Sequence, residues 1–288
     1  MRVNTDCGRA GQQEEWVAVN PTDPPNVIVS QTGAVTGVHY SLQGGASGSF
    51  GDSSVFMDLV PCDPANPLCG PGGYWSYDLF TDPTHAFDPE GNLYFAAIGF
   101  DFLRDPLNGT YVWKGNACGK GQALGNPSDD RCFPIDGFAA VIHDNFAHPM
   151  DQDATPWLSS GWLPGDPGKS QVAAVWTTSQ FGCGPGGSDL CSQPGFISRS
   201  TDGGVTWTRP MEVTGQAPFC VGGDAFTGRP TDAHACNLDE WIHHVIAPDG
   251  SIYVVWLNYN TPTLVNQLLF RRSTDSGATW SRVYRVAD

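Results

Sequence analysis

The sequence is poor in positive charge. Its 288 residues contain 14 Lys and Arg against 30 Asp and Glu, a formal net charge of −16 at pH 7, and only three of the basic residues are Lys. Binding to a nucleic-acid backbone depends on clustered Lys and Arg, so this composition predicts no nucleic-acid partner. The acidity is typical of an exported, soluble protein and favours the binding of cations.

Long apolar runs and a signal peptide are also missing. No stretch approaches the roughly 20 apolar residues of a transmembrane helix, so the sequence predicts no insertion into a membrane. The first residues, Met1-Arg2-Val3-Asn4, do not join a basic stretch to an apolar one. Because the cysteines favour an oxidising compartment, we expect a signal peptide to have been removed and the protein to be secreted or extracellular.

The nine cysteines include no C-x-x-C pair, the spacing typical of zinc sites. Eight of them form short-range couples in Gly-, Pro- and Asp-rich stretches: Cys62 with Cys69, Cys118 with Cys132, Cys183 with Cys191, and Cys220 with Cys236. This pattern is typical of loops pinned by disulfides in an exported protein, with zinc binding as the alternative. Cys7 is left over, either as a free thiol or paired outside this chain.

Glycine and proline, in contrast, are abundant, with 35 and 23 residues. This favours short strands joined by turns over long helices. One pattern, S-x-D-x-G-x-T-W, occurs twice, at 200–207 and 273–280, each time between two β-like runs. It predicts a hairpin turn in which the Asp carboxylate accepts backbone hydrogen bonds, the Gly takes positive φ and the Trp packs beneath. A third copy, with three replacements, spans 41–48.

These octapeptides resemble the Asp box, or BNR repeat, of the sialidase-like β-propellers. The resemblance implies an all-β fold, a β-propeller of four-stranded blades. In that family the box is a structural turn on the outer rim of a blade, remote from the active centre. The octapeptides therefore predict the fold directly and the activity only indirectly.

A longer repeat indicates how many blades there are. Strand starts that combine an acidic residue with hydrophobic ones recur near Glu14, Asp82, Asp153 and Asp239, and each leads through a turn into a β-rich strand. We expect each unit to be one blade, with strands in the order inner, second, third and fourth. A β-sandwich is the alternative, but it explains the turns without the repeated unit.

The predicted blades span residues 12–60, 78–145, 150–216 and 230–288 of a single domain over 1–288. The second unit lacks the octapeptide and contains a Cys-bearing insertion around 104–135. Because propellers of the resembled family usually carry six blades, we expect the chain to be the first part of a longer protein, with a closed four-bladed ring as the alternative.

Candidate catalytic residues lie at the starts of the predicted inner strands, which form the mouth of a propeller funnel. Seven carboxylates recur there: Glu14, Glu15, Asp82, Asp151, Asp153, Asp239 and Glu240. Such a ring suits a cation, or acid and base chemistry where burial raises one pKa, although each acid can equally cap a strand. We predict Asp82, Asp239 and Glu240 as catalytic carboxylates and Arg229 as a contact to an anionic or hydroxyl-rich ligand.

Residues 143–153 form the densest polar cluster, with two His and three Asp among eleven residues. Carboxylates suit Ca²⁺, and imidazoles suit Zn²⁺. We predict His148, Asp151 and Asp153 as metal ligands, with Ca²⁺ favoured and no organic cofactor. An ordinary polar loop is the alternative. The neighbouring imidazoles His243 and His244 lie in a predicted inner strand, so alternation places one toward the propeller axis and the other in the packing between blades.

The resemblance implies an exo-sialidase-type glycoside hydrolase. Sialidases hold the substrate carboxylate with three arginines, the first in a Phe/Tyr-Arg-Ile-Pro motif that this sequence lacks. Four arginines remain that could reach a funnel: Arg9, Arg104, Arg131 and Arg229. The alternatives are a non-catalytic propeller that binds a glycan or a protein, at the cell surface or in the medium, and a purely structural module. An aromatic-lined mouth without converging arginines would favour binding.

The ten tryptophans suit stacking against sugars. We assign Trp16, Trp157 and Trp241 to strand packing. Three others are candidates for ligand-binding loops: Trp75, Trp113 and Trp162.

Overall fold

The structure is a computed structural model, and it describes residues 13–32, 37–46, 50–53, 60–61, 74–75, 79–101, 107–115, 140–145, 148, 151–183, 189–214, 238–258 and 266–287. Strands and turns make up these residues, which include no helix and therefore none that could cross a membrane.

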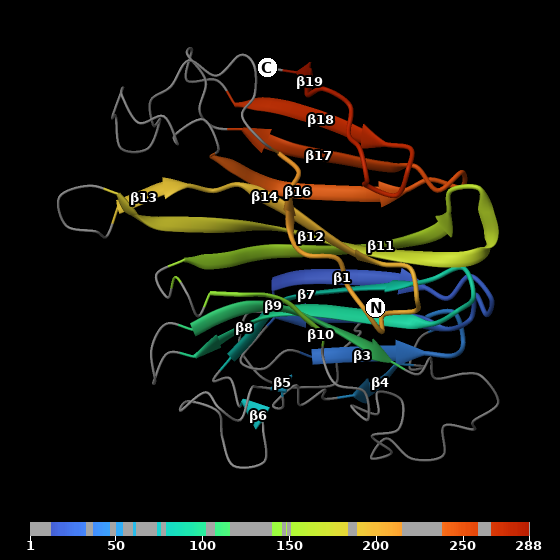
Figure 1. The fold of residues 1–288 in the computed structure, drawn as a ribbon. Coiled ribbons are helices and arrows are strands. Elements are labelled where there is room, and N and C mark those ends of the chain that lie inside the picture. Colours follow the sequence, from blue (N-terminus) through green and yellow to red (C-terminus); the bar gives the residue numbers. More distant parts are fainter. Residues whose placement is uncertain are drawn as a thin grey trace.

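Four antiparallel sheets follow one another along the chain (Figure 1). The first contains β1 (Gln13–Val19), β2 (Val27–Thr32), β3 (Gly37–Ser41) and β4 (Phe50–Ser53). The second contains β7 (Leu79–Phe87), β8 (Leu93–Asp101), β9 (Leu107–Gly115) and β10 (Ala140–Asp144). The third contains β11 (Gln152–Leu163), β12 (Asp166–Cys183), β14 (Gly195–Ser200) and β15 (Met211–Glu212), with β13 (Asp189–Ser192) paired to β12. The fourth contains β16 (Asp239–Ile246), β17 (Ile252–Asn258), β18 (Gln267–Ser273) and β19 (Tyr284–Ala287). Strands β5 (Val60–Pro61) and β6 (Tyr74–Trp75) form a separate pair.

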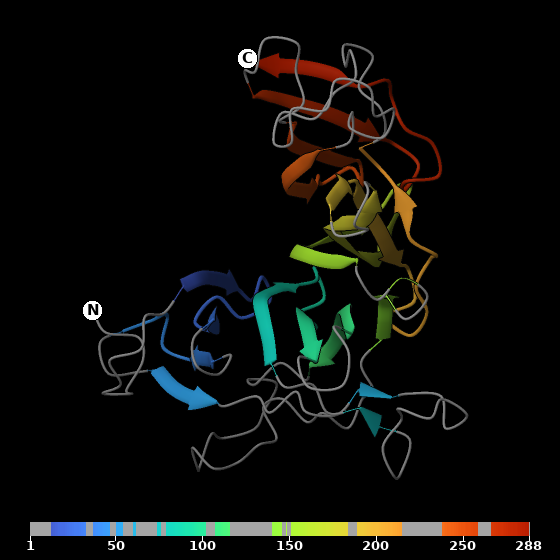
Figure 2. The same cartoon turned by 90° about the vertical axis from the view of Figure 1, so that its left-hand side faces the viewer.

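Within each sheet the main strands pair in chain order, and the sheets are ranged along an arc (Figure 2). Four-stranded meanders arranged in this way are the blades of a β-propeller, so the predicted fold class is confirmed. The grouping of all four blades in one domain over 1–288 stays a prediction. The expectation of an insertion around 104–135 was wrong for residues 107–115, which form β9, the third strand of blade 2. The side chains of Tyr111, Val112 and Trp113 are buried, and this packing holds the segment in the sheet.

Apolar seams join consecutive blades. Between blades 2 and 3, Tyr94 and Val112 pack with Leu158 and Trp176 in one buried cluster. A second cluster between blades 3 and 4 includes Trp256 and Leu269. The burial of these side chains supplies most of the driving force that holds the blades together.

Among the described residues, no blade packs against the face of blade 1 that is turned away from blade 2. Val17 occupies the same place after the strand's bulge as His85, Leu158 and His244 in blades 2, 3 and 4. Those three side chains are 1%, 2% and 2% exposed, whereas Val17 is 62% exposed. The difference shows that an inner strand buries this position only when a blade precedes it.

Both octapeptides form the predicted turn between the third and fourth strands of a blade. In the 200–207 copy, the Asp202 carboxylate accepts hydrogen bonds from the hydroxyl of Ser200 (2.7 Å) and from the backbone N–H (2.9 Å) and hydroxyl (2.5 Å) of Thr206. The 273–280 copy repeats these bonds at 2.7, 2.8 and 2.5 Å. In the 200–207 copy the Ser200 hydroxyl also accepts hydrogen bonds from the N–H groups of Asp202 and Gly204. The third copy keeps this pair of bonds, because the Ser41 hydroxyl accepts from the N–H groups of Gln43 and Gly45.

Each octapeptide tryptophan packs against a seam with the preceding blade. Trp207 contacts the cluster between blades 2 and 3, and Trp280 contacts the cluster between blades 3 and 4. Arg271, beside the second octapeptide, donates to the carbonyls of Ser281 (2.9 Å) and Val213 (2.7 Å). These turns therefore serve the fold.

We expect Asp202→Ala to lower the melting temperature at pH 6 by a few degrees. The hydroxyl and N–H of Thr206 and the hydroxyl of Ser200 lower the pKa of Asp202 to about 2. The carboxyl pKa is about 3.9 in the unfolded chain and lower in the folded protein. The carboxylate therefore stabilises the fold at pH values above about 3.9, and this stability is lost as the pH falls through the folded pKa of about 2. The difference between variant and parent should therefore shrink in thermal melts at pH 2.5. Asp275→Ala, the matched change in the second copy, should behave alike, and a pH-independent difference would contradict this account.

The disulfide prediction stays a prediction. Cys183 and Cys191 lie on the paired strands β12 and β13. The other seven cysteines lie outside the described residues.

Candidate functional site

Each innermost strand carries a bulge near its start. The pairing with the second strand shifts between Gln13 and Trp16 in β1, Thr81 and Thr84 in β7, Ala154 and Trp157 in β11, and Glu240 and His243 in β16. In the last three strands a bulge residue has a left-handed backbone, with φ of 52° at Asp82, 48° at Thr155 and 51° at Trp241. Such residues cost on the order of 1–3 kcal/mol each and cluster at functional sites. The same strain in three blades marks this end of the inner strands as the candidate site.

A pocket of about 200 Å³ lies where these bulges meet. Its lining takes residues from all four blades: Trp16 from β1, Asp82 and Pro83 from β7, Thr155, Pro156 and Trp157 from β11, and Trp241, Ile242 and His243 from β16. The Trp157 ring makes edge contacts with the rings of both Trp16 and His243. The pocket is therefore an aromatic cage whose shape is set by the bulges.

The pocket's polar groups are few. Asp82 is the carboxylate of the lining, and its oxygens accept hydrogen bonds from the backbone N–H of Thr155 (2.9 Å) and the hydroxyl of Thr81 (3.0 Å). Burial lowers the pKa of His243 below 6.5, so this imidazole is neutral at pH 7 and can both donate and accept a hydrogen bond. His244, the next residue, is buried between blades 3 and 4, as the predicted alternation requires.

Asp239, a second predicted catalytic residue, lies in the seam between blades 3 and 4 and does not line the pocket. Its side chain is fully buried, and Oδ1 accepts a hydrogen bond from the Asn258 amide (2.7 Å). Among the described residues, Thr214 and Trp256 lie near enough to affect this carboxyl group, but no side chain makes a hydrogen bond of good geometry to Oδ2. Burial raises the pKa of Asp239 to about 8, against smaller opposing effects of Asn258, Thr214 and Trp256. Asp239 is therefore protonated at neutral pH.

Of the remaining predicted catalytic residues, Glu240 is described, and it does not line the pocket. Glu240 is half-buried in β16 and pairs with Leu257 across the ladder. Arg229 lies outside the described residues, as do Arg9, Arg104 and Arg131. Of the three predicted catalytic carboxylates, all of which are described, Asp82 lines the pocket and Asp239 and Glu240 do not.

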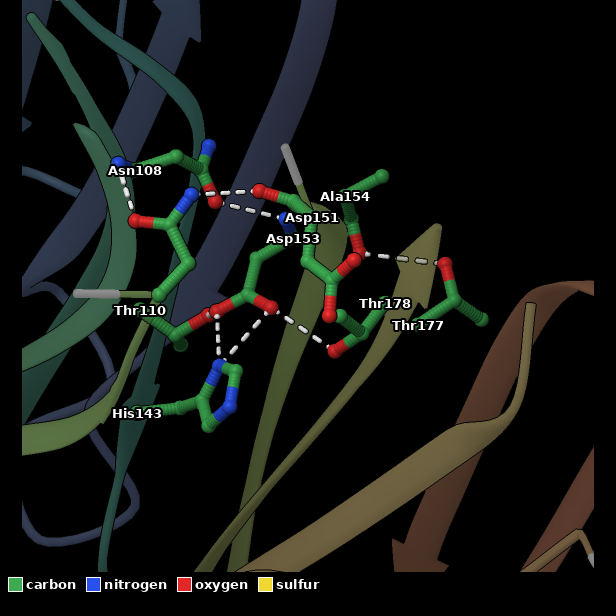
Figure 3. A network of polar contacts seen from close by, with 9 residues as sticks. Asn108, Thr110, His143, Asp151, Asp153, Ala154, Thr177 and Thr178 are labelled. Carbon is green, nitrogen blue, oxygen red and sulfur yellow. Dashed lines mark hydrogen bonds and ion pairs between the residues drawn. The ribbon is translucent and has the colours of Figure 1, made fainter. Parts of the chain in front are cut away.

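Asp153 occupies in blade 3 the place of Asp239 in blade 4, two residues before the left-handed residue. Figure 3 shows it at the centre of a buried network that joins blades 2 and 3. Its carboxylate accepts from the hydroxyls of Thr110 and Thr178, each at 2.7 Å, and pairs with Nδ1 of His143 at 2.9 Å. Its backbone N–H donates to the Asn108 side chain at 2.6 Å. Both carboxylate oxygens are thus fully engaged.

His143 is the partner of Asp153 from blade 2. Burial lowers the pKa of His143, but the hydrogen bond and the charge of Asp153 outweigh burial, so the pKa lies above 6.5. The imidazole also stacks on Phe196, with ring planes 11° apart, and lies against Trp176. The pair is a structural contact between two blades.

The predicted metal ligands do not converge. Among the described residues, no three His, Cys, Asp or Glu side chains are grouped as a metal ion requires. His148 is exposed, Asp151 accepts from the backbone N–H of Phe181 (3.1 Å), and Asp153 is committed to His143. Calcium binding stays a prediction for the chain as a whole.

The sequence analysis missed the aromatic residues of the pocket. Trp16, Trp157 and Trp241 were assigned to strand packing, yet all three line the pocket. The assignment of Trp75, Trp113 and Trp162 to loops was wrong, since they lie in β6, β9 and β11. The pocket could have been found by aligning the four strand starts on Glu14, Asp82, Asp153 and Asp239. In each blade the residues that line the pocket lie at this aligned position or within a few residues after it.

Comparison with known proteins finds similarity to solved structures only, since no family model and no curated protein matches the chain. An α-L-arabinanase of Penicillium chrysogenum, solved with arabinobiose, aligns at 14% identity over 94% of this chain and 66% of its own, with a TM-score of 0.49. An endo-arabinase of Bacteroides thetaiotaomicron aligns at 11% identity over 96% and 80%, with a TM-score of 0.48. A Hadza microbial sialidase aligns at 13% identity over 92% and 46%, with a TM-score of 0.42. The chain thus spans less than two thirds of the length of the first and the third, and activity has to be argued from the site itself.

Proposed function

We propose that this protein binds a carbohydrate in the pocket at the start of its inner strands. The observation that carries the proposal is the convergence of Trp16, Trp157 and Trp241, from three different blades, on one small pocket. Tryptophan offers a flat apolar face to the C–H groups of a sugar ring. The N–H of Trp16 donates to the carbonyl of His85 (2.8 Å), which fixes this ring in the pocket. The neutral His243 supplies a polar group that can orient a hydroxyl-rich ligand.

The size of the pocket favours a small ligand. Its volume of about 200 Å³ is below the roughly 300–1,000 Å³ of most drug-sized ligand sites. A single sugar residue, such as the end of a glycan chain, matches this volume better than a long oligosaccharide. We therefore expect the protein to recognise the terminal residue of a glycan.

Trp157→Ala is expected to weaken sugar binding by about tenfold, because an aromatic contact is worth roughly 0.5–1.5 kcal/mol beyond the area that it buries, and about 1.4 kcal/mol corresponds to a factor of ten. Isothermal titration calorimetry with arabinobiose and with a sialyl oligosaccharide measures this, and the solved neighbours motivate the choice of sugars. Trp162→Ala is the matched control, since Trp162 lies in the same strand and does not line the pocket. Equal affinities of Trp157→Ala and the parent would remove the pocket from the proposal.

A glycoside hydrolase of the exo-sialidase type is the second candidate, favoured by the presence of the Asp82 carboxylate in the pocket. Hydrolysis by the usual route needs two carboxyl groups on either side of the scissile bond, and the described lining residues supply one. Fluorogenic sialosides and arabinosides, assayed with and without Ca²⁺ and without reductant, test this candidate. Turnover would establish it, and binding without turnover would favour a non-catalytic propeller.

A further inference from the structure

We propose that Asp82 is a positioning residue that clamps the bulge of blade 3 and thereby holds Trp157 in the pocket. The proposal rests on the proposed sugar-binding function of the same pocket. It assigns to Asp82 a role that requires no contact with the reacting or bound sugar.

The contacts of Asp82 link three blades. Its backbone N–H donates to the Thr32 hydroxyl of blade 1 at 3.1 Å. Its Oδ2 accepts the backbone N–H of Thr155, the left-handed residue of blade 3, at 2.9 Å, and its Oδ1 accepts the hydroxyl of Thr81 in its own blade at 3.0 Å. One side chain therefore ties the bulge of blade 3 to blade 2, and its backbone ties both to blade 1.

The backbone N–H of Thr155 depends on the Asp82 carboxylate for a hydrogen bond, because it has no partner in the β-sheet. Thr155 lies inside the register shift of β11, between Ala154 and Trp157, so it has no paired residue in β12. An extra residue in a bulge is left out of the ladder, and an unpaired N–H inside a protein is unfavourable. Hydrogen bonds to a charged acceptor are stronger than neutral ones. The carboxylate thus replaces the missing ladder bond and stabilises a left-handed β-branched residue.

The backbone conformation of Thr155 affects the pocket because Trp157 is close to it in the sequence. Trp157 is two residues beyond Thr155, with Pro156 between them, and all three line the pocket. The proline fixes its own φ, so a change in the backbone at Thr155 is passed on to Trp157. Release of the Thr155 N–H is therefore expected to move the ring that packs on Trp16 and His243.

Amide hydrogen exchange of Thr155 in the ligand-free protein, followed by NMR, tests the clamp directly. Asp82→Ala should accelerate this exchange by about 10- to 100-fold, the loss expected for one hydrogen bond to a charged group. Asp82→Asn should keep most of the protection, because its amide oxygen can still accept the N–H. Asp166→Ala, a carboxylate in the distant β11–β12 hairpin, is the matched control. Unchanged protection in Asp82→Ala would overturn the proposal.

The binding arm separates positioning from direct contact. Asp82→Ala should weaken sugar binding as strongly as Trp157→Ala, whereas Asp82→Asn, which keeps an acceptor for the Thr155 N–H, should lose clearly less affinity at pH 7. Loss of binding in Asp82→Asn with Thr155 still protected would show that the charge meets the ligand, and would overturn the proposal. If the parent binds no sugar, the proposed function fails. The hydrogen exchange of the Thr155 amide still tests whether Asp82 holds the bulge of blade 3. Should Asp82→Ala not fold, Asp82→Ser, with a shorter side chain, carries the same expectation.

Discussion

Asp239→Asn is expected to raise the free energy of unfolding at pH 8. In the parent this free energy should decrease between pH 4 and pH 8, and the variant should lose most of that decrease. Burial raises the pKa of Asp239 to about 8 in the folded protein, against about 3.9 when unfolded. A raised folded pKa gives stability that is fully present below the unfolded pKa and is lost as the pH rises through the folded one. One group of this kind lowers stability by at most about 1.4 kcal/mol per pH unit in that window.

Asparagine fits the Asp239 site because it has nearly the same shape and stays neutral at every pH. Its oxygen can still accept from Asn258. Urea unfolding at pH 5, 7 and 8 measures the effect, and Asp166→Asn, a carboxylate on the half-buried β11–β12 hairpin, is the control. The Asn variant should gain most at pH 8 and least at pH 5. Parallel stability curves for the parent and the Asn variant would show that Asp239 does not titrate in this window.

Asp153→Ala is expected to cost roughly 3–5 kcal/mol in the free energy of unfolding, because it leaves half-buried His143 without its negative partner. It also removes the shared acceptor of the Thr110 and Thr178 hydroxyls. Asp153→Asn keeps one acceptor oxygen and should lose less. Urea unfolding at pH 6 provides the measurement.

A double-mutant cycle between Asp153→Asn and His143→Gln isolates the pairing itself. Since the pKa of His143 is raised, the stability from this pair is fully present below pH 6.5 and is lost as the pH rises through the folded pKa. The coupling energy should therefore be larger at pH 5.5 than at pH 8.5. A coupling near zero at both pH values would contradict the assignment of a charged pair.

The two buried aspartates show how one position acquires different properties. Both lie two residues before a left-handed bulge residue, and both face the preceding blade. Blade 2 offers His143 to Asp153, whereas blade 3 offers the neutral Thr214 to Asp239. The first carboxyl group pairs with an imidazole, whereas burial raises the pKa of the second to about 8. The prediction of Asp239 as a catalytic acid remains untested, and its burial away from the pocket favours a role in the seam.

The sequence by itself determined the local features of this protein. The Ser, Asp, Gly and Thr of each octapeptide act within eight residues, so their hydrogen bonds follow from spacing alone. Strand alternation also placed His243 and His244 on opposite faces, and the recurrence of strand starts gave four blades. These results depend on backbone geometry that neighbours in sequence share.

Only the tertiary structure decided which residues meet. The cage of Trp16, Trp157 and Trp241 joins three blades. The hydrogen bond from the Thr155 N–H to the Asp82 carboxylate joins residues that are 73 positions apart in the sequence. Nor does the sequence distinguish Asp153 from Asp239, because the hydrogen-bond partners of each carboxyl group depend on the side chains that the preceding blade presents. Burial, strain and charge pairing arise from contacts across the seams, and a linear pattern carries no information on the distances within them.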